Sequence, residues 1–296
     1  MPKAIKNLGA SVMARLLRIS KDKGLNFDLV LTHYAIERLL FRLAQSKHVD
    51  RFVLKGAMLF MTWFYEPIRG TRDLDLLGYG EPSQQFIRSV FAEILCQEHP
   101  DGVRFDVDAI RIDATRSHDP YGGVRHRTTA DFGGAQIAVH VDVGFGDAVE
   151  PPAKWLDYPV LLDMPSPRLL GYAHETVIAE KFQALVDLGL ANSRIKDYYD
   201  LWIISKAFDI DQSLLAQSIA ATFVRRGTEI PIEIPDGLSP IFSNDPLKRQ
   251  LWNRLVGDLE INPHSLEDIV AELADFLMPV ATSANQLVPP RTKSPR

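Results

Sequence analysis

The stretch from Phe52 to Gly78 places the tightest constraint on how this chain can fold. It opens as a short apolar strand at 52–54, breaks at Lys55-Gly56-Ala57, and resumes as an apolar, helix-like run over 58–64. A polar turn then leads into Arg72-Asp73-Leu74-Asp75-Leu76, where acidic and apolar residues alternate. Because strand side chains point alternately to opposite faces, this pattern predicts a strand with its leucines in a core and both aspartates on the other face.

A pair of aspartates on one strand face needs an explanation. Aspartate is a poor strand former, and two carboxylates side by side repel each other unless a cation lies between them. Mg²⁺ binds carboxylate and phosphate oxygens, so Asp73 and Asp75 are candidate magnesium ligands. An Asp-x-Asp triplet alone is also typical of solvated turns and strand edges, so the rest of the chain must decide between the two interpretations.

The composition sets broad limits. The 296 residues are enough for one large domain or two ordinary ones, and 46% hydrophobic and 24% charged residues are typical of globular proteins. A net charge of −5 argues against a surface covered with nucleic-acid-binding groups, although a local basic groove remains open. The single cysteine, Cys96, excludes an internal disulfide. With no signal-peptide pattern and no apolar run of membrane-spanning length, we expect a cytoplasmic protein without a membrane segment.

The pattern of elements predicts an α+β fold with a mixed, largely antiparallel sheet in the first half and helices in the second. The predicted helices of the first half are 10–19, 27–44 and 84–96, and its strands are 103–107, 109–114, 125–132 and 135–143. Proline-rich turns over 151–167 mark a boundary, and helices are predicted beyond it at 176–190, 196–207, 214–225, 247–259 and 266–277. The predicted domains are an α+β domain over 1–165, a helical domain over 166–280 and a disordered basic tail over 281–296.

A third carboxylate is a candidate to join Asp73 and Asp75. The run from Ile137 to Val143 alternates cleanly, with Asp142 and His140 on the face opposite its branched residues. If this strand lies beside the Asp73 strand, Asp142 completes a cluster of three acids. Asp106 and Asp108 compete for the role, but the strand of Asp142 is apolar enough to be central, where an acid needs a reason to be buried. We interpret His140 as a neighbour of the site.

The second half offers a cation and two more acids. Lys181 lies on the apolar stripe of the helix predicted from residue 176, where a buried ammonium needs an anionic partner or must extend to solvent. Asp197 and Asp200 lie on the core side of the next helix near its start. The helix dipole is the simplest explanation for acids at that position, and pairing with Lys181 is the other.

Five motifs in order resemble the AbiEii/AbiGii toxin family, nucleotidyltransferase-like toxins of type IV toxin–antitoxin and phage-defence systems, with the MenT toxins as relatives. Each motif is weak alone, but their order is specific, and the resemblance covers roughly residues 11–204. The motifs are Arg51-Phe52-Val53-Leu54-Lys55-Gly56, Arg69-x-Thr71-x-Asp73-x-Asp75, the strand ending in Asp142, Glu175…Glu180-Lys181-Phe182-x-Ala184, and Arg194-x-Lys196-Asp197-Tyr198-x-Asp200-Leu201.

The resemblance implies a polymerase-β-like nucleotidyltransferase core followed by a helical domain. It implies transfer of a nucleoside monophosphate from an NTP, with Mg²⁺, to an acceptor that in MenT-like relatives is the tRNA 3′ end, and a cognate antitoxin as partner. The implied catalytic residues are Asp73, Lys181 and Asp197, with Asp73, Asp75 and Asp142 as metal ligands. The implied nucleotide-binding residues are Lys55, Gly56, Ala57, Arg69, Thr71 and Arg72. Where the superfamily has Gly-Gly or Gly-Ser this chain has Gly56-Ala57, so phosphate contact there would come from backbone N–H groups.

Two other functions fit parts of the pattern. A kinase-type phosphotransferase on the same fold would use a similar magnesium site but would transfer the γ-phosphate. A non-catalytic antitoxin-docking or RNA-binding module would not need this set of charged residues, so the presence of Asp73, Asp75, Lys181 and Asp197 favours an enzyme.

Overall fold

The computed structural model describes residues 7–65, 70–114, 122–257, 259 and 263–288, and the chain divides into two compact units. The first unit comprises Met1–Gly146 and Lys154–Gly171, and the second comprises Asp147–Ala153 and Tyr172–Arg296. The segment 154–171 therefore belongs to the first unit, whereas 147–153, which precede the boundary predicted at 165, belong to the second. Within the described residues, no helix combines the length and apolar content that crossing a membrane requires.

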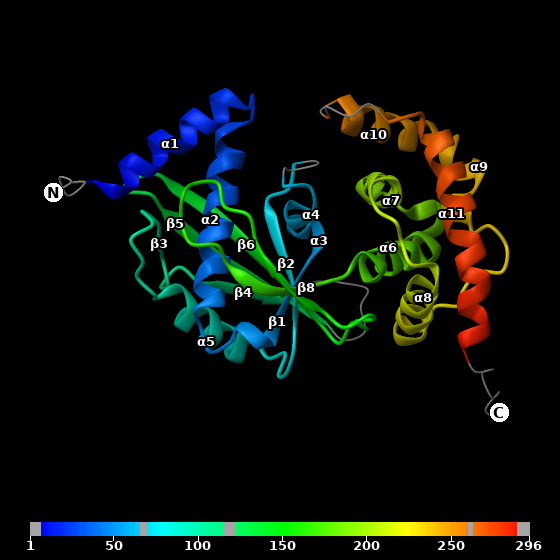
Figure 1. Ribbon diagram of the computed structural model, residues 1–296, viewed down its shortest axis with the longest axis horizontal. Helices are drawn as coiled ribbons and strands as arrows, with labels where there is room; N and C mark the ends of the chain where they lie inside the picture. The colour runs from blue at the N-terminus through cyan, green and yellow to red at the C-terminus, as the bar shows by residue number, and fades with distance from the viewer. Residues whose placement is uncertain (1–6, 66–69, 115–121, 258, 260–262, 289–296) are drawn as a thin grey trace. The chain divides into compact units, whose positions relative to one another are not determined.

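The first unit is built on one mixed sheet, with the strand order β3-β5-β6-β2-β1-β8-β7 and with β4 paired to β5 (Figure 1). Its strands are β1 (Phe52–Lys55), β2 (Asp73–Gly78), β3 (Arg104–Phe105), β4 (Arg111–Ala114), β5 (Gly123–Asp131), β6 (Gln136–Phe145), β7 (Lys154–Asp157) and β8 (Arg168–Gly171). Its helices are α1 (Leu8–Asp22), α2 (Phe27–Ala44), α3 (Gly56–Leu59), α4 (Met61–Phe64) and α5 (Gln84–Leu95), with a 3₁₀ turn, η1, at Val49–Arg51. Strands β2 and β6 are parallel, as are β1 and β8, and the remaining pairs are antiparallel.

The middle of the sheet follows directly from the alternating sequence. Leu74 and Leu76 of β2 are buried, and so are Val139, Val141 and Val143 of β6, whereas the residues between them are partly exposed. Burial of one face of each strand fixes the register, because a slip of one residue would turn every apolar side chain outward. The prediction that these two strands are neighbours is confirmed.

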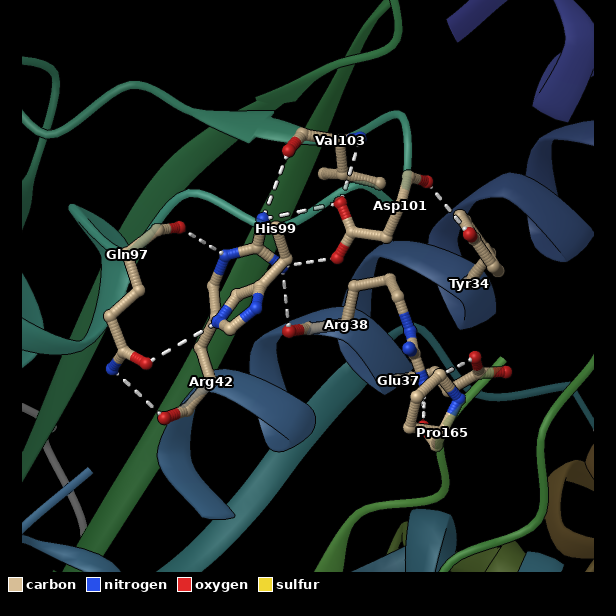
Figure 2. Close-up of polar contacts among 9 residues, drawn as sticks. All are labelled: Tyr34, Glu37, Arg38, Arg42, Gln97, His99, Asp101, Val103 and Pro165. Carbon is tan, nitrogen blue, oxygen red and sulfur yellow. Dashed lines mark hydrogen bonds and ion pairs between the residues drawn. The ribbon is translucent and has the colours of Figure 1, made fainter. Parts of the chain in front are cut away.

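Helix α2 is fastened to loops of its own unit by buried ionic side chains, which Figure 2 shows. Arg42 pairs with Asp101 at 2.7 Å and donates to the carbonyl oxygen of Val103 at 3.0 Å. Arg38 donates to the carbonyl oxygen of Pro165 at 3.0 Å. Both arginine side chains are 1% exposed. A buried charge is costly unless it is paired, and here Arg42 pairs with Asp101 and Arg38 pairs with Glu37 at 2.8 Å.

The second unit is helical, as predicted. Its helices are α6 (His174–Leu188), α7 (Ile195–Ala207), α8 (Gln212–Arg226), α9 (Pro240–Ser243), α10 (Pro246–Gly257) and α11 (Leu266–Leu287), with 3₁₀ turns η2 at Gly189–Ala191 and η3 at Asp236–Leu238. The core is formed where α6 packs on α8 and where α11 packs on α7 and α8.

The apolar run over 58–64 is helical, as predicted, and it forms two short helices, α3 and α4, with Tyr65 in a left-handed conformation ending the second. Two other local predictions were wrong. The strand predicted over 103–107 spans two residues only, because the Asp106 side chain accepts the N–H groups of Asp108 and Ala109 and makes a turn. The tail predicted from 281 is helical to Leu287, since buried alanines at 281 and 284 continue the apolar face of α11. Residues 289–296 lie outside the described residues.

Candidate active site

Asp73 and Asp75 project from the same face of β2, at the centre of the sheet. The register opposes Asp75 to Asp142 and Asp73 to His140 on the neighbouring strand β6. The His140 ring nitrogen Nδ1 lies 3.4 Å from a carboxylate oxygen of Asp73, and these side chains are 37% and 45% exposed. The structure thus brings the three predicted acids to one face of two adjacent strands, with the predicted neighbour beside them.

The backbone at Gly56 lies close to the side chain of Asp75. Its φ of +66° lies in the left-handed region that favours glycine, and a Cβ added there would lie 2.7 Å from Cβ and Cγ of Asp75. Lys55, the last residue of β1, is the cross-strand partner of Asp75 on β2. The break between strand and helix is therefore a close approach of the backbone to a carboxylate, which explains why the chain has glycine at this position.

The segment leading into β2 is held by a buried histidine. Nε2 of His33, on α2, lies 2.9 Å from the carbonyl oxygen of Thr71 and donates a hydrogen bond to it. Burial lowers the pKa of His33 and the positive charge of Arg72 lowers it further, whereas the hydrogen bond to Thr71 acts in the opposite direction. Sequence reasoning missed this residue, because a histidine on a helix that precedes the motif by 38 positions carries no local signal. Of the predicted nucleotide-binding residues nearby, Thr71 is half-buried, Arg72 is exposed, and Arg69 lies outside the described residues.

Asp142 has a partner that the sequence analysis did not foresee. Nε of Arg125, on β5, donates to Oδ1 of Asp142 at 2.7 Å, and Nη2 donates to Oδ2 at 2.5 Å. The two side chains are 36% and 23% exposed. The hydrogen bonds to Asp142 raise the pKa of Arg125, as do the negative charges of Asp142, Asp73 and Asp75, so the guanidinium stays charged. A fixed positive charge therefore contacts Asp142 and interacts electrostatically with Asp73 and Asp75.

The second unit contains a separate ionic cluster. The ammonium of Lys181, on α6, pairs with both Asp197 and Asp200 on α7, and its distance to Asp200 is 2.8 Å. The Lys181 and Asp197 side chains are 15% and 14% exposed, whereas Asp200 is fully buried. The suggestion that Lys181 extends to solvent is therefore wrong, and the acidic partners that a buried ammonium requires are the two predicted aspartates.

The described residues contain no group of three or more histidine, cysteine, aspartate or glutamate side chains arranged to hold a metal ion. Asp142 is engaged by Arg125, and Asp73 and Asp75 lie beside it on the same sheet face, two residues apart on one strand. Two carboxylates completed by substrate phosphates and water are a usual ligand set for Mg²⁺, so the residues present fit the ion.

The family of the chain is shown by its sequence. Residues 38–275 match the family of AbiEii nucleotidyl transferase toxins of type IV toxin–antitoxin systems. The chain belongs to the AbiEii family. Since that match spans both units, the predicted family, enzyme class and α+β fold are confirmed, and the chain is an AbiEii nucleotidyltransferase with a helical C-terminal region.

Two solved structures resemble this AbiEii protein. The crystal structure of JHP933 from Helicobacter pylori is 16% identical with a TM-score of 0.48, over 87% of this chain and 94% of that one. A second H. pylori protein, described as a candidate nucleotidyltransferase, is 14% identical with a TM-score of 0.50, over 89% of this chain and 99% of that one. At this identity the second likeness concerns the fold alone. No curated protein matches the sequence.

Proposed function

We propose that this AbiEii protein is a toxin that transfers a nucleoside monophosphate from an NTP to the 3′ end of tRNA in the cytoplasm, with Mg²⁺ as cofactor, and that a cognate antitoxin counteracts it. The observation that carries the proposal is the pair of carboxylates, Asp73 and Asp75, on one partly exposed sheet face of a chain in this family.

The carboxylates of Asp73 and Asp75 would hold the ion against the triphosphate. When bound, Mg²⁺ neutralises phosphate charge and lowers the pKa of the attacking hydroxyl. The glycine conformation at Gly56 leaves room for the Asp75 side chain beside the first turn of α3. Lys55, Ala57 and Thr71 lie in or next to these elements and, together with Arg69 and Arg72, remain predicted nucleotide-binding residues.

The reaction exchanges one bond for another. The acceptor 3′-hydroxyl oxygen forms a bond to the α-phosphorus of the NTP, the bond from that phosphorus to the bridging oxygen of the β-phosphate breaks, and pyrophosphate leaves. By the family resemblance Lys181 and Asp197 take part in this reaction, and we propose that role for them. Asp197 is partly exposed and can exchange a proton with substrate, whereas the buried Asp200 holds the ammonium of Lys181 in place.

The test follows the labelled phosphate. Purified protein is incubated with Mg²⁺, tRNA and each NTP carrying ³²P at either the α or the γ position. Label on RNA from the α position alone supports nucleotidyl transfer. Label from the γ position indicates a kinase, and absence of label with every NTP indicates a non-catalytic module.

Two controls sharpen this test. Periodate oxidation of tRNA removes the terminal diol, so labelling that persists on oxidised tRNA contradicts the 3′ end as acceptor. Asp73→Asn removes one negative charge with little change in volume and should abolish transfer while circular dichroism shows a folded protein. Full activity of this variant would contradict the metal assignment.

A further inference from the structure

Asp142 lies between a negatively charged and a positively charged residue on the same sheet face. In register, its neighbour on β2 is Asp75 and its neighbour on β5 is Arg125. The Arg125 pair is bidentate, with two charge-assisted hydrogen bonds of 2.7 and 2.5 Å, which is the strongest geometry available to an arginine and a carboxylate. Both oxygens of Asp142 are engaged by Arg125.

A second ion pair that involves β5 is more exposed and is made through a single contact. Arg127 lies two residues along β5 from Arg125, on the same face, and contacts Asp113 of β4 through one distance of 3.4 Å. Its side chain is 48% exposed and that of Asp113 is 56% exposed, against 36% and 23% for Arg125 and Asp142. Exposed single contacts of this kind contribute little, so Arg127 provides a matched comparison.

The charge of Arg125 is permanent and acts on the whole cluster. A guanidinium is not deprotonated in proteins, and the negative charges of Asp73 and Asp75 as well as Asp142 act on this one. A divalent ion that used Asp142 as a ligand would compete with two charge-assisted hydrogen bonds for the same carboxylate and would lie beside a fixed positive charge. An ion held by Asp73 and Asp75 would not compete with those two hydrogen bonds.

We propose that Arg125 is a built-in cation that occupies Asp142 in place of a second metal ion, so that the sheet site binds one divalent ion. The proposal rests on the proposed magnesium site at Asp73 and Asp75, because it concerns how many ions that site admits. Arg125 then supplies, without metal, part of the positive charge that a second ion brings to a two-metal site. Asp142 becomes the residue that positions Arg125.

The experiment counts bound ions in the full-length protein, using Mn²⁺ as a probe in place of Mg²⁺. Electron paramagnetic resonance of free Mn²⁺ is recorded during titration in the presence of a non-hydrolysable NTP analogue, with ions held by the analogue alone subtracted. We expect one ion per chain in the wild type and in Arg127→Gln. We expect two in Arg125→Gln, where Asp142 is released, and one again when Asp142→Asn is added to Arg125→Gln.

Each outcome has one meaning. Two ions in the wild type, or one ion in a folded Arg125→Gln variant, overturns the built-in cation while leaving the proposed nucleotidyl transfer intact. No ion in the wild type overturns the proposed magnesium site and this inference with it. Arg125→Lys keeps a positive charge on β5, so this variant of the protein should bind one ion. It therefore distinguishes the effect of losing the charge from the effect of changing the side chain, in case Arg125→Gln is unstable.

Discussion

His126 is buried without hydrogen bonds and should make the first unit sensitive to acid. It lies on β5 with its side chain 0% exposed, and its ring stacks on Phe91 with centroids 4.4 Å apart. Among the described residues, neither ring nitrogen has a hydrogen-bond partner. Burial lowers the pKa of His126 to about 4, with a further contribution from the positive charge of Arg88.

The direction and size of the effect follow from this lowered pKa. Because the unfolded chain titrates near 6.5, it takes up the proton first as the pH falls, so stability is full above that value and is lost between about pH 6.5 and pH 4. The two pKa values differ by about 2.5, which corresponds to about 3 kcal/mol when the loss is complete. At pH 5 the loss from His126 should be about 2 kcal/mol.

The perturbation is His126→Phe, which keeps an aromatic ring against Phe91 and removes the titrating group. Urea unfolding followed by circular dichroism at pH 7.5 and pH 5 should show about 2 kcal/mol less acid destabilisation in the variant than in the wild type. Hydrogen exchange of the peptide 123–131, corrected for its intrinsic pH dependence, reports the same difference locally. His264→Gln replaces an exposed histidine and should retain the wild-type difference. If His126→Phe loses as much stability at pH 5 as the wild type, the reasoning is refuted.

Three further variants test other contacts. Gly56→Ala places a Cβ on a left-handed backbone against a carboxylate and should lower nucleotidyl transfer about a hundredfold in steady-state assays; wild-type activity would show that the close approach is dispensable. Asp101→Ala leaves the buried charge of Arg42 unpaired and should lower the free energy of unfolding by about 3–5 kcal/mol in urea melts; a loss below about 1 kcal/mol would contradict a paired buried charge. Asp200→Asn removes a buried partner of Lys181 and should lower kcat with little change in the KM for NTP; an unchanged kcat would show that Asp200 does not position that lysine.

The central strands could be predicted from the sequence because their pattern has a single physical solution. Alternation over 73–76 and 137–143 fixes which residues face the core. Two strands with the same buried face in one small domain are expected to pair in one sheet, and they do. The helix with Lys181 was predicted for the same reason, since its apolar stripe has the period of a helix. Helical periodicity does not identify the partner of a polar residue on that stripe. For this reason the sequence could not show whether the ammonium of Lys181 extends to solvent or pairs with the two aspartates.

Two further features could not be predicted from local sequence. The apolar run after Gly56 is helical, as predicted, but its composition does not indicate the division into two four-residue helices. The hydrogen bond from His33 to Thr71 joins positions that no local pattern relates. In each case the sequence gives the tendency of a segment, and packing against the rest of its unit decides the outcome.

Arg125 is different, because its position beside Asp142 could have been derived. The hairpin between β5 and β6 turns at Gly133 and Gly134, whose φ values of +81° and +121° suit glycine, and Asp131 pairs with Gln136 across that turn. Six positions further from the turn, the same register pairs Arg125 with Asp142. Since strand side chains alternate in step across a ladder, two residues in register share a face. A candidate ligand on a hairpin strand therefore has to be considered together with the residue that the turn places opposite it, and here that residue is a permanent cation.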